Sequence, residues 1–203
     1  KFTQLIKKLM PGDETEINYQ PKYLDRNVLN TPAIALELST KEVARMGDLA
    51  LENIHKAFEA VDKYDKKKVE FVLDHEPVVD SLEEAITVYL TKMSETNMSK
   101  EMSTVHTGLL HACSDIERIG DHAETIAKRV RSMNEDGTHF SAQANAEMKE
   151  LEVLVEGAAT KAIKALETHD QELAKASLDL SHQVSAKQKA MRKSHVERLN
   201  KGI

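Results

Sequence analysis

The sequence predicts an all-α protein made of long antiparallel helices, and three observations lead to this fold class. The 203 residues include only 7 glycines and 4 prolines, so turns are scarce. Aromatic residues make up 4% of the chain, whereas good helix formers such as alanine, leucine, glutamate and lysine are abundant. Apolar residues recur every three or four positions, which is the spacing of one helix face. These features exclude a β-sandwich or a β-barrel, because both need many turns and many β-branched or aromatic residues.

Residues 1–30 are expected to form a linker or arm ahead of the first helix. Their beginning, Lys1–Met10, is basic and amphipathic. The first helix is predicted to begin at Thr31, whose hydroxyl can cap it, with Pro32 at the first helical position. Its apolar face continues to Val61.

Two further helices are predicted in the first part of the chain. The second begins near Asp65 and runs to about Met93, and the third begins after Ser99. The third helix has the most regular apolar spacing of the chain, and a turn that ends in Gly137 stops it.

The apolar pattern then restarts, which predicts an internal repeat. In a fourth helix, Leu151 and Val155 repeat the spacing of Val43 and Gly47 in the first helix. A fifth helix follows and runs close to the end of the sequence. We therefore expect tandem three-helix bundles whose second repeat lacks its last helix.

The repeat divides the chain into a first three-helix unit over 31–137 and a second, incomplete unit over 138–203. Two helices without a third leave an apolar stripe on each of them. We expect the first three helices, or another chain, to cover the stripe of the fourth and fifth helices.

Charge and cysteine content narrow the function classes. The net charge of −6 provides no basic field, so a nucleic-acid partner is not expected. The single cysteine, Cys113, excludes an internal disulfide and a cysteine-rich zinc site. The sequence holds no apolar run near the roughly 18 residues of a membrane span, and Lys1–Gly12 lacks the apolar stretch of a signal peptide. We expect a reducing, cytoplasmic environment.

Two acidic pairs are the candidate metal ligands. Glu117 and Asp121 in the third helix stand four residues apart, and Glu76 and Asp80 repeat this spacing in the second helix. Residues four apart share a helix face, so antiparallel packing can bring the two pairs together. Four carboxylates between helices suit Mg²⁺, Mn²⁺, Ca²⁺ or iron. Gly120, inside one pair, favours a close approach of a neighbouring helix or ligand.

A different interpretation stays open at this point. Each pair can belong to a solvated acidic face that Arg118 or a lysine neutralises. Glu76 also precedes Pro77, which disfavours helical geometry. The second helix then kinks or begins afresh there, which would move Glu76 relative to Asp80.

Other candidate residues carry weaker signals. Glu52 and His55 form one Glu-x-x-His motif, but ferritin-like di-iron bundles need two such motifs. His75 and His122 adjoin the acidic pairs, yet neighbours in a helix point about 100° apart, so we expect both at the surface. Cys113 is expected to be a buried structural thiol.

The run Glu117-Arg-Ile-Gly-Asp-His-Ala-Glu-Thr-Ile-Ala127 resembles the signature of PhoU-type proteins, which are phosphate-responsive regulators built from two three-helix repeats. Three earlier stretches are similar to the cytoplasmic PhoU-like region that follows the membrane domain of bacterial Na⁺/phosphate cotransporter family proteins. These stretches are Pro21–Asp25, Thr31–Glu37 and Glu42–Asp48.

The resemblance implies a metal site, because acidic pairs on the second and third helices of a PhoU repeat bind a metal cluster. The matching residues here are Glu76, Asp80, Glu117 and Asp121. The resemblance thus implies a divalent or iron cation and no organic cofactor. In the fifth helix, Ser181 and Ser185 stand where the acidic pair would be, so the second repeat is expected to lack a complete site.

The resemblance further implies a non-enzymatic regulatory domain that modulates phosphate uptake. Its expected partner is the membrane transport domain of the same polypeptide, at the cytoplasmic face of the membrane, and association between copies of the chain is left open. Three alternatives remain. They are a free-standing PhoU-like regulator, a carboxylate-bridged metalloenzyme, and a structural bundle with solvated acidic residues.

Overall fold

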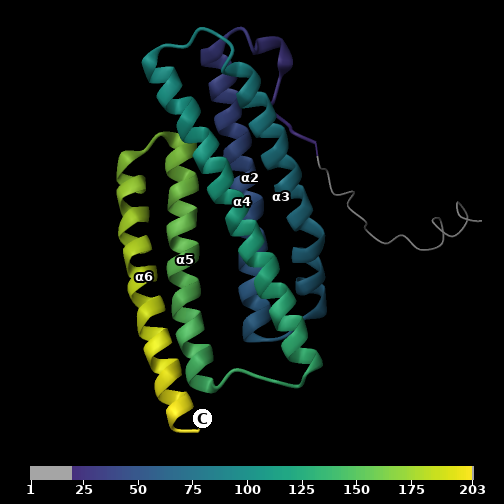
Figure 1. Ribbon diagram of the computed structural model, residues 1–203, viewed down its shortest axis with the longest axis vertical. Helices are drawn as coiled ribbons and strands as arrows, with labels where there is room; N and C mark the ends of the chain where they lie inside the picture. The colour runs from purple at the N-terminus through teal and green to yellow at the C-terminus, as the bar shows by residue number, and fades with distance from the viewer. Residues whose placement is uncertain (1–19, 203) are drawn as a thin grey trace, which may run out of the picture.

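A computed structural model describes residues 20–202, and within this range all regular secondary structure is helical, without strands (Figure 1). The predicted all-α fold class is confirmed. The helices are η1 (Arg26–Val28, a 3₁₀ turn), α2 (Pro32–Asp62), α3 (Lys66–Met93), α4 (Lys100–Glu135), α5 (Ala142–Thr168) and α6 (Gln171–Asn200). Residues 1–19, which include the basic stretch of the predicted arm, lie outside the described residues.

The helix starts follow the predicted caps with one difference. Asp65 accepts a hydrogen bond from the backbone N–H of Lys67 at the start of α3, and Ser99 caps α4 in the same way. Thr31 precedes α2, but its side chain makes no cap hydrogen bond, so the predicted hydroxyl cap is wrong. Its backbone carbonyl instead accepts from the N–H groups of Ile34 and Ala35, and Pro32 has no N–H to satisfy.

Helix α3 continues through Pro77 as one helix, so the interpretation that it begins afresh there is wrong. Pro77 itself is exposed, whereas Val78 and Val79 beside it are buried. Burial of this face stabilises the helical backbone that the proline alone would disfavour.

Helices α2, α3 and α4 form an antiparallel three-helix bundle that holds nearly all buried residues (Figure 1). Its interior divides into two core clusters. The first core cluster includes Val43, Met46, Leu82, Leu90 and Leu109. The second core cluster includes Ile54, Phe58, Val72, Ala127 and Val130.

Helices α5 and α6 form a hairpin that packs against the bundle through α5, with α6 on the outside (Figure 1). Helix α5 buries only Ile163 and Ala165, and α6, all of which is described, buries none of its residues. The first three helices therefore cover part of the hairpin's apolar face, and Leu178 and Leu199 of α6 stay exposed. No described helix is apolar over a stretch long enough to cross a membrane.

The described part of the predicted arm, residues 20–30, packs against α2 and α3. The backbone N–H groups of Lys22 and Tyr23 donate to one carboxylate oxygen of the buried Glu42, at 2.8 and 2.6 Å. The Tyr89 hydroxyl donates to the Asp25 carbonyl at 2.7 Å. These contacts fasten the segment to the end of the bundle where α2 begins.

Candidate functional site

The two core clusters meet halfway along the bundle, and the predicted acidic residues lie at this junction. In α3 the second core cluster ends at Val72 and the first begins at Val78. In α4 the first ends at Ile116 and the second resumes at Ala123. Glu76, Glu117 and Asp121 lie between these limits, and Asp80 lies just beyond Val78.

Three of the four predicted ligands come together there. One carboxylate oxygen from each of Glu76, Asp80 and Asp121 lies within 4.8 Å of the other two, and we call these residues the α3–α4 acidic cluster. Asp80 and Asp121 are exposed, whereas Glu76 is only 7% exposed. The cluster thus reaches from the protein surface into the core.

Glu117 lies outside this group, one helical turn before Asp121. Burial, and then the charges of Asp121 and Asp80, raise the pKa of the Glu117 carboxyl above its ordinary value. The charges of the cluster therefore act on the Glu117 carboxylate, although its oxygens do not lie within 4.8 Å of the three ligand oxygens as a group.

Glu76 is the most perturbed of these groups. Burial, and then the hydrogen bond and charge of Asp80, raise the pKa of its carboxyl to about 7. Its Oε1 atom is buried and has no hydrogen-bond partner among the described residues. A buried oxygen of this kind is costly unless a cation or a proton donor satisfies it.

No described lysine or arginine forms an ion pair with the α3–α4 acidic cluster. Arg118, which the solvated interpretation needs as a neutralising partner, lies near Asp115 at 3.7 Å and is exposed. The negative charges of the cluster are consequently not compensated by the described residues around it.

Gly120 explains how the two helices come so close. A Cβ atom at Gly120 would lie 3.3 Å from Cγ1 of Val79, which is tighter than most such contacts. The expectation of a close helix approach at this glycine is confirmed. This approach sets the separation of the acidic residues that flank Val79 in α3 and Gly120 in α4.

Asn53 is a buried polar residue at the same junction that the sequence analysis missed. It lies in α2 between Ala50 of the first core cluster and Ile54 of the second. It is 1% exposed, and neither polar atom of its amide has a hydrogen-bond partner among the described residues. An asparagine in step with the apolar positions Met46 and Ala50 was the signal that could have revealed it.

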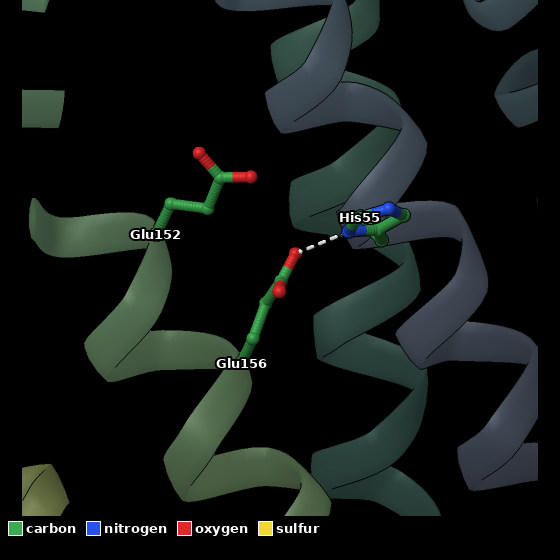
Figure 2. A group of neighbouring side chains, drawn as sticks. All are labelled: His55, Glu152 and Glu156. Atoms are coloured by element: carbon green, nitrogen blue, oxygen red, sulfur yellow. Dashed lines mark hydrogen bonds and ion pairs between the residues drawn. The ribbon is translucent and has the colours of Figure 1, made fainter. Parts of the chain in front are cut away.

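A second group of potential ligands lies between α2 and α5. His55, Glu152 and Glu156 each offer one ligand atom, and these atoms lie within 4.8 Å of one another; we call this group the α2–α5 histidine–glutamate cluster (Figure 2). The Nδ1 atom of His55 is 2.8 Å from Oε1 of Glu156. Glu52, the other half of the Glu-x-x-His motif, is exposed and is not in this group.

The remaining candidates lie outside both clusters. Cys113 is buried, as expected, and burial raises the pKa of its thiol to about 12, so it stays protonated. His75 is half-buried, stacks on the ring of Phe71 and contacts the Phe71 carbonyl through Nδ1 at 2.8 Å. His122 is exposed, as expected.

Comparisons with known proteins agree with the resemblance of α2, α3 and α4 to PhoU-type proteins. Residues 43–130 match the model of the PhoU domain. The chain is 28% identical over 107 residues to a phosphate-specific transport system accessory protein PhoU homolog of Clostridium acetobutylicum, covering 51% of this chain and 48% of that protein. It is 30% identical over 94 residues to the homolog of Xylella fastidiosa, covering 46% of this chain and 39% of that protein.

A longer relative has a different name. Over 128 residues the chain is 26% identical to the putative inorganic phosphate export protein YjbB of Escherichia coli, covering 61% of this chain and 23% of that protein. The matched regions thus span about half of these curated relatives or less. No solved structure gives a significant match. The segment 43–130, which carries all four predicted metal ligands, is therefore the part of the chain that is similar to the PhoU domain.

Proposed function

We propose that this protein is a PhoU-like regulator of phosphate transport whose α3–α4 acidic cluster binds a divalent or iron cation. The observation that carries the cation part is the carboxylate of Glu76, which has a buried, unpartnered Oε1 atom and offers one oxygen within 4.8 Å of ligand oxygens from Asp80 and Asp121. The transport part is supported by the matched PhoU domain and by relatives named for phosphate transport.

The donor set fits a hard cation. Carboxylate oxygens are the ligands that Mg²⁺, Ca²⁺ and Mn²⁺ prefer, and carboxylates also hold iron. Glu76 and Asp80 from α3, and Asp121 from α4, would hold the ion, with Glu117 near enough to join through a shift of its side chain or a water. A bound cation would offset the mutual repulsion of these groups and fasten α3 to α4, which gives the bundle two states of different rigidity.

Cation binding can be tested on the full chain after chelation. Mg²⁺, Mn²⁺, Ca²⁺ and Fe²⁺ are added separately, with binding followed by calorimetry and by thermal unfolding. An ion that saturates the site at about 100 times its Kd should raise the Tm by roughly 5–10 °C. Asp80→Asn and Asp121→Asn should remove this shift.

Asp115→Asn is the matched control, because Asp115 lies in α4, is exposed and is outside the acidic cluster. It should keep the full shift. If none of the four ions changes the Tm of the wild-type protein, or if Asp115→Asn weakens binding as much as Asp121→Asn, the cation proposal is wrong.

Two arrangements of the regulator are each favoured by one comparison. A free-standing accessory protein agrees with the Clostridium acetobutylicum and Xylella fastidiosa relatives, which carry that name. A regulatory domain attached to a transporter, at the cytoplasmic face of the membrane, agrees with the Escherichia coli relative, of which the match covers only 23%. The match covers 48% of the Clostridium acetobutylicum accessory protein but only 23% of the Escherichia coli protein, and we therefore favour the free-standing arrangement.

Cell fractionation separates these arrangements. The native gene product is followed with an antibody against the α4 segment, and phosphate uptake is measured in cells with and without it. A gene product found outside the membrane fraction supports the accessory arrangement, and one that stays in the membrane fraction after a salt wash supports the attached one. Uptake that is identical with and without the gene product would contradict both.

A further inference from the structure

Helices α2 and α5 pack in a constant antiparallel register. Near one end of their contact, a Cβ atom at Gly47 would lie 2.8 Å from Cγ1 of Ile163. Near the other end, Nζ of Lys149 lies 2.9 Å from Oδ1 of Asp62. Between these two contacts, the same register places two residues of α2, four positions apart, opposite two residues of α5 with the same spacing.

These facing pairs are His55 and Glu59 on α2, and Glu152 and Glu156 on α5. Figure 2 shows the Glu156 carboxylate directed at the His55 ring, with Glu152 one turn away on the same helix. Glu59 is already neutralised by Lys56 at 3.1 Å and Lys68 at 3.3 Å. The α2–α5 histidine–glutamate cluster consists of the other three groups, with which neither lysine forms an ion pair.

We propose that the α2–α5 histidine–glutamate cluster is a second metal site, which takes a divalent transition-metal ion of the Zn²⁺ type and fastens the α5–α6 hairpin to the bundle. One imidazole nitrogen and two carboxylates make a three-ligand site with positions left for water. An imidazole ligand favours Zn²⁺ and similar ions over Mg²⁺ and Ca²⁺, whose ligands are oxygens. This site does not depend on the α3–α4 acidic cluster, which has oxygen ligands only.

Charge around the cluster is consistent with a cation there. Glu152 makes no hydrogen bond or ion pair among the described residues, although Glu156 stands four residues away on the same helix face. The nearby Lys149 is engaged with Asp62. Apart from His55, the described residues therefore supply no ion-pair partner for these two carboxylates.

The second nitrogen of His55 lies near a carboxylate that could orient the ring while the first nitrogen binds the ion. Its Nε2 atom faces Oε1 of Glu59 at 3.9 Å. A histidine that ligates through one nitrogen usually has its other N–H directed at a carboxylate, which fixes the ring. With Nδ1 on the ion, Glu59 is the group that would orient His55, and it need not be a ligand itself.

The position of the cluster gives such an ion a structural consequence. The α5–α6 hairpin buries only Ile163 and Ala165, so it depends on its contact with α2 for a fixed position. An ion that joins α2 to α5 would suppress opening of this contact, and the docking of the hairpin would respond to transition-metal concentration.

The test compares ions and variants on the full chain after chelation. Zn²⁺ and Mg²⁺ are titrated by calorimetry into the wild type and into His55→Gln, Glu152→Gln and Asp80→Asn, and Co²⁺ absorption reports whether a nitrogen ligand is present. We expect His55→Gln and Glu152→Gln to weaken one Zn²⁺ equivalent by at least about tenfold and to leave Mg²⁺ binding unchanged. Asp80→Asn should do the opposite, so this proposal and that of the acidic cluster can fail separately.

Glu52→Gln is the control, because Glu52 is an exposed acid on α2 one turn from His55 and outside the cluster. It should bind Zn²⁺ as the wild type does. Hydrogen exchange gives a second readout, since Zn²⁺ should slow exchange of α5 amides in the wild type and not in His55→Gln. Equal Zn²⁺ binding by the wild type, His55→Gln and Glu152→Gln would overturn the proposal, as would Zn²⁺ binding without slower exchange in α5.

Discussion

The α2–α4 bundle and the α5–α6 hairpin have a similar apolar pattern in sequence but differ sharply in burial. In the bundle, Leu82, Ile86 and Leu90 are completely buried. In the hairpin, Leu178 is 57% and Leu199 60% exposed. The bundle has a third helix to cover the stripes of the other two, and the described part of the hairpin has none.

An apolar repeat therefore predicts a helix face without predicting which element covers that face. A groove of about 610 Å³ lies between α4, α5 and α6, with Ile119 of α4 and Leu166 of α5 among its lining residues. The hairpin is held by one face of α5, so its position should be less stable than the bundle's fold.

The largest expected contrast comes from shortening one buried side chain in each region. Leu82→Ala should lower the free energy of unfolding by about 3–5 kcal/mol, because it leaves a cavity in the closed first core cluster. Ile163→Ala should cost less, about 1–2 kcal/mol, since the open hairpin contact can close around the gap. Urea unfolding measures both changes.

Hydrogen exchange tells where each change acts. Leu82→Ala should speed exchange in α2, α3 and α4 together, whereas Ile163→Ala should speed it in α5 and α6 and leave the bundle unchanged. Faster exchange in α2–α6 together with either variant would mean that bundle and hairpin unfold as one unit.

A buried carboxyl should give the bundle a pH dependence. The pKa of Glu76 is about 7 in the folded protein, above its ordinary 4.5, so the folded state binds more protons between these values. Stability of the chelated protein should be highest below about pH 4.5 for this group and fall as the pH rises through 7, by about 2–3 kcal/mol.

Glu76→Gln isolates this effect from other titrating groups. Unfolding by urea is measured from pH 4.5 to 8 in chelated wild type and variant, and the difference in slope belongs to Glu76. The variant's curve should be flatter, and parallel curves would contradict a raised pKa at this position.

The helices could be predicted from sequence because their signals are local. Asp65, Ser99 and Gly137 mark ends, and the apolar spacing between them fixes which face is buried. Pro77 is the exception, since its local preference against a helix is overridden by the burial of its neighbours. Tertiary packing decided that point, and a sequence pattern does not contain it.

The candidate sites were predictable only where their ligands share a helix face. Spacing by four brought Glu76 and Asp80 together with Asp121, but the helix rotation that leaves Glu117 outside the group depends on how α3 and α4 pack. The partners of His55 lie on α5, about a hundred residues away, and only the register of α2 against α5 brings them close.

A glycine pair tests how tightly the hairpin fits against the bundle. Gly47→Ala places a methyl group 2.8 Å from Cγ1 of the buried Ile163, so either this side chain or α5 has to shift, and the α2–α5 contact should be strained by about 1 kcal/mol. Gly108→Ala meets no atom within 4 Å in α4, and should instead stabilise the protein by about 0.5–1 kcal/mol. Thermal unfolding compares the two variants, and stabilisation by both would show that α5 yields easily to α2.

The smallest effect is expected where bundle and hairpin meet through charges. The side chains of Lys149 and Asp62 are 58% and 48% exposed, so water and salt screen their attraction. Lys149→Ala should therefore lower the free energy of unfolding by no more than about 0.5 kcal/mol and leave exchange in α5 nearly unchanged. Because Ile163→Ala should affect α5 much more strongly, the two variants together separate apolar docking of the hairpin from docking by charge. A larger effect of Lys149→Ala than of Ile163→Ala would mean that the ion pair, and not the buried face of α5, holds the hairpin in place.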